Sequence, residues 1–183
     1  EGVDLKKDVF YANFADNPSL PSTQPPRSQS FLDAFVSATA RGASKLVVLT
    51  ISSALSGTFE SARTAAYGYK YPVTVIDSKS TSMGMGFQLL AMARTAEAGG
   101  GVPEVIQAAA RVRDRIQMRL SLDTLDYVVK GGKISGIAGR IGSILRLKPQ
   151  LKFSTETGSA DPGDISTSRG KALDAMFNSI NKQ

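Results

Sequence analysis

Apolar and polar segments alternate along the chain in a pattern that predicts strands followed by helices. Residues 46–51 form an almost unbroken apolar run, and residues 71–76 form a second, β-branched one. Such runs suit strands that are covered on both faces of a parallel sheet. Residues 56–67 between them predict a helix, so the three segments together predict a β-α-β unit with a right-handed crossover.

Apolar spacing and terminating glycines predict further helices. In residues 31–41 the apolar side chains recur at helical spacing, with Ser28 or Ser30 expected as the cap and Gly42 at the end. The other segments with this pattern are residues 83–98, 102–115 and 168–180. Three glycines, residues 99–101, separate the first two of these.

The remaining segments predict short strands, turns and loops. The first 14 residues indicate a short helical turn or an irregular entry, and the prolines of residues 17–26 predict a loop. After residue 115, the expected elements are a short strand over 118–122, a helical turn over 125–130, a strand over 148–154 and a turn over 158–164.

The composition is that of an ordinary soluble protein, and it removes several kinds of chemistry. At 183 residues and 42% hydrophobic, the chain suffices for one domain or two small ones. Because it contains no cysteine and no histidine, it cannot build a disulfide, a thiolate nucleophile, a His-ligated metal site or a Ser-His-Asp triad from its own residues. The absence of cysteine permits a cytosolic address. No segment has the length of a transmembrane helix, and residues 1–4 do not have the character of a signal peptide.

The net charge of +6 is concentrated late in the chain. No acidic residue lies between Asp126 and Glu156, and six basic ones do: Lys130, Lys133, Arg140, Arg146, Lys148 and Lys152. This basic window fits an anionic ligand, a partner or a membrane surface, and a solvated basic face is the simpler alternative. With few aromatic side chains in the window, nucleic acid is not the expected partner.

Hydroxyl side chains gather where the first strand ends and the next helix begins. They are Ser52, Ser53, Ser56 and Thr58. The N–H groups and the positive dipole end of that helix would point to the same place, which predicts an anion site at the carboxyl edge of the sheet. A plain capping turn with Ser56 as N-cap is the alternative. Asp77, Asp123 and Asp126 form a further candidate set of carboxylates, although no spacing fixes their distances.

Glycines recur with isoleucines over residues 132–145, and this density allows a backbone to approach another group closely. A lid, a wall against an apolar ligand and a tight loop-helix junction all fit this pattern. Residues 84–86 lack the third glycine of a dinucleotide fingerprint, and residues 163–171 lack the spacing of a phosphate-binding P-loop.

Four segments carry motifs that occur in this order in one known family. They are Ile-Ser-Ser-Ala-Leu-Ser-Gly-Thr-Phe-Glu-Ser-Ala at 51–62, Val-Ile-Asp-Ser-Lys-Ser-Thr-Ser-Met-Gly-Met-Gly at 75–86, Leu-Asp-Thr-Leu-Asp-Tyr at 122–127 and Lys-Gly-Gly-Lys-Ile at 130–134. Residues 22–25, Ser-Thr-Gln-Pro, resemble the Thr-Ser-Gln-Pro loop of the same family, with Ser22 at the position of its threonine. Residues 145–149 match its Leu-x-x-Lys-Pro strand entry. From about residue 2 to residue 173, the chain resembles the DegV family of bacterial fatty-acid-binding proteins.

The resemblance implies an α/β fold in which a parallel β-α-β sheet domain packs against a second α/β domain, with the ligand cleft between them. The two domains would cover residues 1–80 and 81–183. Both would be incomplete, because the family's opening strand and its C-terminal region with a histidine have no counterpart here, so the chain is expected to be an internal piece.

The resemblance also implies a cytoplasmic carrier of one long-chain fatty acid, without cofactor, metal or catalytic residue. Ser22 and Ser53 would contact the carboxylate. The full set of expected ligand-binding residues is Ser22, Thr23, Ser52, Ser53, Ser56, Gly57 and Thr58. Members that serve a fatty acid kinase make such a kinase a candidate partner, with transient contact to an anionic membrane as another. Of the family's Arg-Thr-Arg segment before the final helix, only Arg169 is present.

Two functions of other classes stay open beside the carrier. One is an enzyme for a small phosphate or acyl phosphate, with residues 52–58 around the anion and Lys79 or Lys133 neutralising it, although no general base is evident. The other is an interaction fragment whose basic, glycine- and isoleucine-rich segment docks on a partner.

Overall fold

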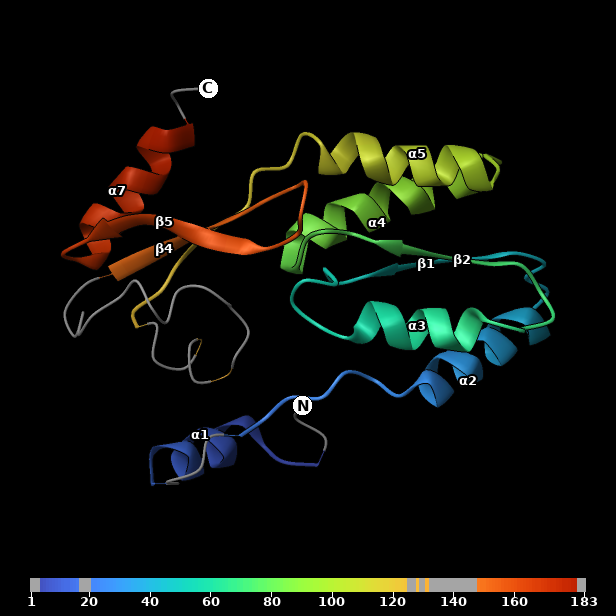
Figure 1. Cartoon of the computed structure of the whole chain (residues 1–183), viewed down its shortest axis with the longest axis horizontal. Coiled ribbons are helices and arrows are strands. Elements are labelled where there is room, and N and C mark those ends of the chain that lie inside the picture. Colours follow the sequence, from blue (N-terminus) through green and yellow to red (C-terminus); the bar gives the residue numbers. More distant parts are fainter. Residues whose placement is uncertain (1–3, 17–20, 125–127, 129–130, 132–147, 181–183) are drawn as a thin grey trace.

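The computed structural model describes residues 4–16, 21–124, 128, 131 and 148–180. Helices and strands alternate through the first part of the chain, and strands dominate the second (Figure 1). Their bounds are α1 (Lys7–Asp16), α2 (Ser28–Ala40), β1 (Leu46–Thr50), α3 (Thr58–Ala66), β2 (Val73–Asp77), α4 (Ser82–Glu97), α5 (Val102–Arg113), β3 (Arg119–Ser121), β4 (Lys148–Phe153), β5 (Ala160–Ser166) and α7 (Arg169–Ile180).

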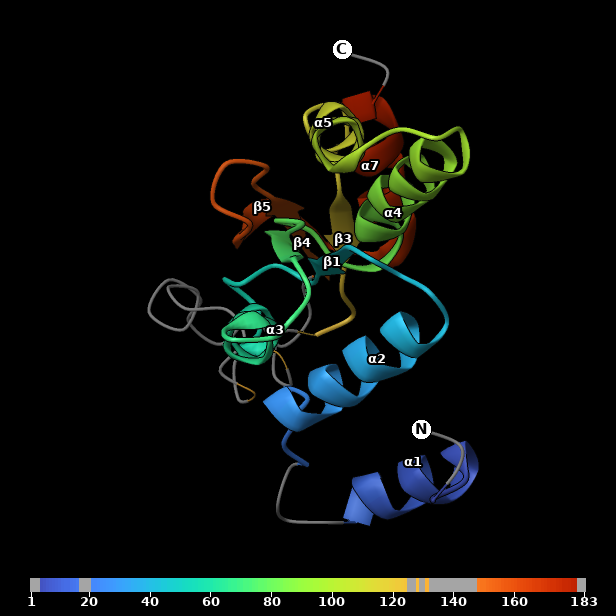
Figure 2. The ribbon, with the colours of Figure 1, turned by 90° about the vertical axis from the view of Figure 1, so that its right-hand side faces the viewer.

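A parallel pair of strands forms the first sheet, which confirms the predicted β-α-β unit. Strand β1 pairs with β2 in a register that sets Leu46 opposite Val73 and Thr50 opposite Asp77. Helix α3 lies on one face of this pair and α4 and α5 on the other, as both views show (Figure 1 and Figure 2). The sheet is therefore covered on both faces, as its apolar strands predict.

The core of this unit lies between the sheet and the α4–α5 layer. Met92, Val105 and Ala109 are buried there and pack against partly buried strand residues, which are Val47, Leu49 and Ile76. On the opposite face, Ala62 and Ala65 of α3 are buried. The two-domain division at residue 80 stays a prediction, and this packing of α4 and α5 favours a boundary after α5.

Three antiparallel strands in the order β3-β4-β5 form the second sheet, and α7 packs against it. Leu151 and Ala160 are its buried centre, and Leu55 from the turn after β1 packs against them. The prediction of a turn over residues 158–164 is wrong, because strand β5 begins at Ala160. The turn lies earlier, where the N–H of Gly158 donates to the carbonyl of Ser154 at 2.8 Å. Pro162 is tolerated within β5 because one side of this edge strand has no partner in the described sheet.

The other predicted elements are confirmed within a few residues of their expected ends. Helix α2 begins at Ser28 itself, so neither Ser28 nor Ser30 is its N-cap; Arg27 holds that position without a side-chain hydrogen bond. Gly42 follows the helix with φ +97°, a left-handed conformation that glycine adopts readily. The predicted helical turn over 125–130 lies mostly outside the described residues, and the segment 132–145 lies wholly outside them.

Candidate functional site

Two polar turns meet at the carboxyl edge of the parallel sheet, one after each strand. The N–H of Ser52 donates to the carbonyl of Ser80 at 2.8 Å, and the N–H of Ser78 donates to the carbonyl of Thr50 at 3.1 Å. Parallel strands end at a shared edge, so residues about 25 positions apart become neighbours there. The expected polar edge is therefore present.

Ser53 lies exposed at this edge and is held by Asp77 from the neighbouring turn. Its hydroxyl donates to Asp77 Oδ2 at 2.5 Å, and its backbone N–H donates to Asp77 Oδ1 at 3.2 Å. Asp77 Oδ1 also accepts the backbone N–H of Lys79 at 2.8 Å. One carboxylate thus organises both turns, and Ser53 has a fixed place at the mouth of the edge.

Ser52, by contrast, faces inward and is 0% exposed. Its hydroxyl donates to the carbonyl of Gly158 at 2.7 Å and accepts the N–H of Ala54 at 3.2 Å. The Lys79 ammonium donates to the carbonyl of Glu156 in the same β4–β5 turn. The described geometry therefore gives Ser52 a role in joining the two sheets, away from any ligand that approaches the exposed side.

Gly158 is required at the tip of the β4–β5 turn for two reasons. Its φ of +73° is strained for an L-residue with a side chain, and an added Cβ would meet Ser52 Oγ and, at 3.0 Å, the Cα of Lys79. The bare backbone of this residue is what lets the turn sit directly on the edge of the parallel sheet.

Ser56, Gly57 and Thr58 form the entry to α3. The hydroxyls of Ser56 and Thr58 lie 2.8 Å apart in a hydrogen bond, and the N–H of Thr58 donates to Ser56 Oγ at 3.3 Å. The helix begins at Thr58 with Gly57 as N-cap, so the alternative of a capping turn with Ser56 as N-cap is wrong. Two hydroxyls and the free N–H groups of the first helical turn remain together at the edge.

Ser22 and Thr23 lie in the exposed, extended segment that precedes α2. The ring of Pro25 in this segment lies 3.4 Å from the position that a Cβ on Gly57 would take. The proline loop thus contacts the entry of α3 through Pro25. No described contact joins Ser22 or Thr23 to Ser53, so their shared role stays a prediction.

Helix α4 offers the apolar surface nearest in sequence to these turns. Four of its large apolar side chains are exposed: Met83, Phe87, Leu89 and Leu90. Gln88 on its inner side is buried and donates to the carbonyls of Ser78 and Gly84, both at 3.1 Å. Gln88 therefore fixes the start of α4 against the second turn. The other expected wall of a tunnel, residues 134–145, lies outside the described residues.

The two sheets approach each other closely on the side of Ser80. Its hydroxyl lies 3.8 Å from Met118 Sδ, just before β3. The space that Ser80, Gln88, Met118 and Phe153 line there is about 10 Å³, far below the volume of an acyl chain. A cleft between two domains, as the resemblance implies, stays a prediction.

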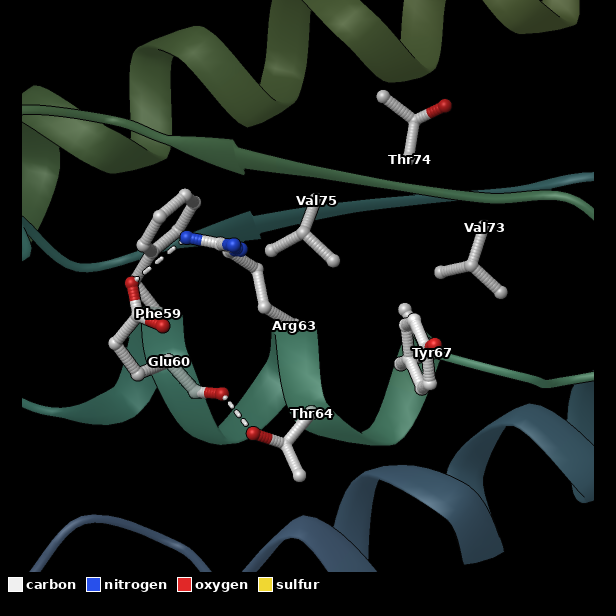
Figure 3. A pocket seen from close by; sticks show the side chains of 9 residues that line it. Phe59, Glu60, Arg63, Thr64, Tyr67, Val73, Thr74 and Val75 are labelled. Carbon is white, nitrogen blue, oxygen red and sulfur yellow. Dashed lines mark hydrogen bonds and ion pairs between the residues drawn. The ribbon is translucent and has the colours of Figure 1, made fainter.

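A larger open groove of about 840 Å³ lies between α3 and β2 (Figure 3). Figure 3 shows the ion pair between Arg63 and Glu60 at 3.1 Å and the bond from Thr64 Oγ1 to the Glu60 carbonyl at 2.9 Å. None of the residues that line the groove is a predicted binding residue. They are Phe59, Glu60, Arg63, Thr64, Ala66, Tyr67, Val73, Thr74 and Val75. The groove is therefore separate from the hydroxyl-bearing edge.

Part of the basic window is paired with acid. Lys148 Nζ lies 3.1 Å from Asp123 Oδ1, and Arg169 lies 3.8 Å from Asp123 Oδ2. The hydrogen bond and charge of Lys148, and then the charge of Arg169, hold the pKa of Asp123 below its usual value. Asp77 and Asp123 thus have different partners and form no described carboxylate pair. Lys130, Lys133, Arg140 and Arg146 lie outside the described residues.

The described ranges carry neither a membrane-spanning helix nor a cluster of metal-binding carboxylates. In these residues, no helix has both the length and the apolar character needed to cross a membrane. The same part of the chain holds no group of three or more Asp or Glu side chains arranged to bind a metal ion.

Sequence reasoning missed Asp77 as the partner of Ser53 and missed the β4–β5 turn as the partner of Ser52. The signal for Asp77 was its place directly after β2, opposite Thr50 in the sheet register. No local pattern signalled the contact of Ser52 with Gly158, which joins positions 106 residues apart.

Comparison with known proteins connects this fold to one family. The profile of the family described as "Uncharacterised protein, DegV family" matches residues 1–183. A DegV domain-containing protein of Deinococcus radiodurans is 34% identical over 173 residues, which are 94% of this chain and 60% of the relative. The chain thus spans about 60% of the length of that relative.

Two solved structures are similar in fold and above 25% in identity. A DegV family protein from Thermus thermophilus, described as binding fatty acid, is 28% identical with a TM-score of 0.84, over 94% of this chain and 60% of that protein. A stearic acid-binding protein from Eubacterium ventriosum is 27% identical with a TM-score of 0.79, over 99% of this chain and 63% of that protein. These likenesses confirm the α/β fold that the sequence predicts.

Proposed function

The chain belongs to the DegV family, and from this premise we propose that it binds a long-chain fatty acid by the hydroxyl-bearing edge of its parallel sheet. The supporting observation is that the edge keeps an exposed, fixed hydroxyl at Ser53 beside the start of α3. The fatty acid binding named for the similar proteins of Thermus thermophilus and Eubacterium ventriosum gives the ligand class.

The headgroup lies at Ser53 in this proposal, with the Ser56–Thr58 turn and the Ser22–Thr23 segment on either side. Burying a carboxyl group removes it from water, so several hydrogen bonds must replace those that it loses. The hydroxyls of Ser22, Ser56 and Thr58 and the first N–H groups of α3 supply such bonds. Ser52 supports the turn from behind through Gly158, and Gly57 lies beside the ring of Pro25.

The acyl tail packs on the exposed apolar side chains of α4. A tail of roughly 14 methylene groups, at about 0.8 kcal/mol each, contributes on the order of 11 kcal/mol before the costs of association and ordering. Within the described part of the chain, the side chains of Met83, Phe87 and Leu90 are exposed, and a bound acyl chain would shield them from water. The other predicted lining of the tail, residues 134–145, lies outside the described residues.

An enzyme acting on a small phosphate or acyl phosphate has less support. The Ser52 hydroxyl and the Lys79 ammonium, which that function needs for an anion, are both engaged by backbone carbonyls of the β4–β5 turn. We therefore infer a binding protein rather than a catalyst. As a carrier it would act in the cytoplasm and deliver its ligand to a fatty acid kinase or to an anionic membrane.

Native mass spectrometry of the purified protein tests the proposed function. A retained mass in the range of long-chain fatty acids, released on denaturation, is the expected result. A retained phosphate ester, or displacement of a fluorescent fatty acid by phosphate esters alone, contradicts it. Absence of any lipid, together with no binding of added palmitate, contradicts it as well.

A further inference from the structure

The hydroxyl proton of Ser53 is already donated within the protein. Ser53 Oγ lies 2.5 Å from Asp77 Oδ2 and donates to it, while the Ser53 backbone N–H donates to the other oxygen of the same carboxylate. A serine hydroxyl has one proton to give and two lone pairs. In this arrangement, the Ser53 oxygen therefore meets a ligand as an acceptor.

Asp77 has no neutralising cation among the residues that the structure describes. Lys79, on the same turn, donates its backbone N–H to Asp77, but its ammonium is bonded to the carbonyl of Glu156 in the β4–β5 turn. Arg113, at the end of α5, pairs with Asp114 at 3.3 Å. Within the described part of the chain, the charge on Asp77 is thus offset by hydrogen bonds from neutral donors.

A fatty acid carboxyl group at Ser53 would come close to this charge. A ligand oxygen bonded to Ser53 Oγ would lie about 2.7 Å from it. Since Asp77 Oδ2 is 2.5 Å from the same oxygen, the two carboxyl groups would be within about 5 Å. Two ionised carboxylates at such a separation oppose each other, and one proton shared between them removes the repulsion.

We propose that the ligand carboxyl and Asp77 share one proton through the Ser53 hydroxyl, so that fatty acid binding takes up one proton from solvent. The proposal rests on the proposed function, because it needs a carboxyl headgroup at Ser53. In one arrangement, the protonated ligand donates to Ser53 and Ser53 donates to ionised Asp77. In the other, protonated Asp77 donates to Ser53 and Ser53 donates to the ionised ligand. Each arrangement contains two protons. One is the Ser53 hydroxyl proton, and the other is taken up from solvent.

This coupling makes affinity depend on pH. A free fatty acid is a carboxylate near neutrality, so the shared proton must come from solvent when the complex forms. Apparent affinity for palmitate then falls by up to about tenfold for each pH unit between 6.5 and 8.5. The Asp77→Asn variant has no charge at this position. Its side-chain oxygen can keep the backbone N–H groups of Ser53 and Lys79, while its NH2 donates to Ser53 Oγ and leaves the Ser53 proton for the ligand. It should therefore bind palmitate without proton uptake and with little pH dependence.

Isothermal titration calorimetry at pH 7.5 with palmitate in two buffers of different ionisation enthalpy counts the protons taken up. We expect close to one for the unchanged protein and close to zero for Asp77→Asn. Asp161→Asn is the matched control, because Asp161 also accepts a serine hydroxyl, from Ser159 at 3.1 Å, and has no described hydrogen bond to Ser53 or Asp77. This control should keep the uptake near one.

Each outcome separates this proposal from the proposed function. Palmitate binding without proton uptake by the unchanged protein overturns the shared proton and leaves fatty acid binding intact, whereas absence of binding overturns the function itself. Uptake that persists in Asp77→Asn overturns the role of Asp77. If that variant does not fold, the unchanged protein decides: palmitate should weaken with rising pH while 1-hexadecanol, which lacks a carboxyl group, should not, and a flat palmitate profile overturns the proposal.

Discussion

Two serines on separate segments, Ser22 and Ser53, are the residues on which headgroup binding should depend most. Each hydroxyl that bonds a charged group typically contributes roughly 1.5–3 kcal/mol, so replacing both by alanine should weaken fatty acid binding by more than tenfold. Displacement of a fluorescent fatty acid measures this. Ser30→Ala, an exposed serine on α2, is the control and should bind normally. Equal affinity of the double variant and the control contradicts the assignment.

Gly158 offers a second test at this scale, with a matched control elsewhere in the chain. Gly158→Ala introduces both backbone strain at φ +73° and crowding against Ser52 and Lys79. Gly68→Ala introduces strain at φ +74° with nothing within 4 Å of the added Cβ. We expect about 1–2 kcal/mol lost in the control and clearly more in Gly158→Ala, measured by urea unfolding. Equal losses would show that the turn does not sit tightly on the edge.

The residues that bear hydroxyls were predictable from sequence, but their partners were not. Ser52 and Ser53 are adjacent. Successive side chains of an extended chain point to opposite sides, so one of the two serines faces inward and the other outward, but the sequence does not say which. In the structure, the Ser52 hydroxyl donates to the carbonyl of Gly158, and the Ser53 hydroxyl donates to the carboxylate of Asp77. Such pairings depend on how distant segments pack, for which no local pattern exists.

At the scale of elements, helix α4 should set the chain-length preference of the protein. If its exposed apolar side chains and residues 134–145 enclose the tail, each added methylene buries more apolar surface until the space is filled. Palmitate should therefore bind far more tightly than octanoate. A displacement series from eight to eighteen carbons measures the trend. Affinity that is independent of length would instead indicate recognition of the headgroup alone.

The strands and helices with a clear apolar pattern were predicted correctly from the sequence, whereas strand β5 was predicted as a turn. Strands β1 and β2 are apolar because both of their faces are covered, so their sequence alone marks them. Strand β5 carries Pro162 and Gly163, which are typical of turns, and it is a strand only because it pairs with β4. Local sequence propensity predicts an edge strand poorly when its extended conformation depends on hydrogen bonds to the neighbouring strand.

At the scale of the whole molecule, the basic window should govern delivery of the ligand rather than its binding. Only the apolar side chains of residues 134–145 are predicted to enclose the tail, so the charged side chains of Lys133 and Arg140 are not among the predicted binding residues. Charges that remain in solvent act over only about 8–10 Å at physiological ionic strength. Reversing both to glutamate should slow transfer of a fluorescent fatty acid from the protein to anionic vesicles while equilibrium affinity stays within about twofold.

Two further measurements sharpen that expectation. Transfer by the unchanged protein should also slow as salt is raised, because screening weakens the encounter. Transfer to neutral vesicles is the control and should be the same for both proteins. If the unchanged protein and the variant transfer fatty acid to anionic vesicles at the same rate, the basic window has no role in delivery and is only a solvated basic surface.

The hydrogen bond between Ser52 and Gly158 also has a consequence for the order of folding. It spans 106 positions, whereas the β-α-β unit closes over far shorter separations. Because long loops must close before such contacts form, the parallel pair should assemble first and the β4–β5 turn should dock late. During synthesis, the edge around Ser53 would therefore exist before its support, and a stable ligand site would appear only once residue 158 has left the ribosome.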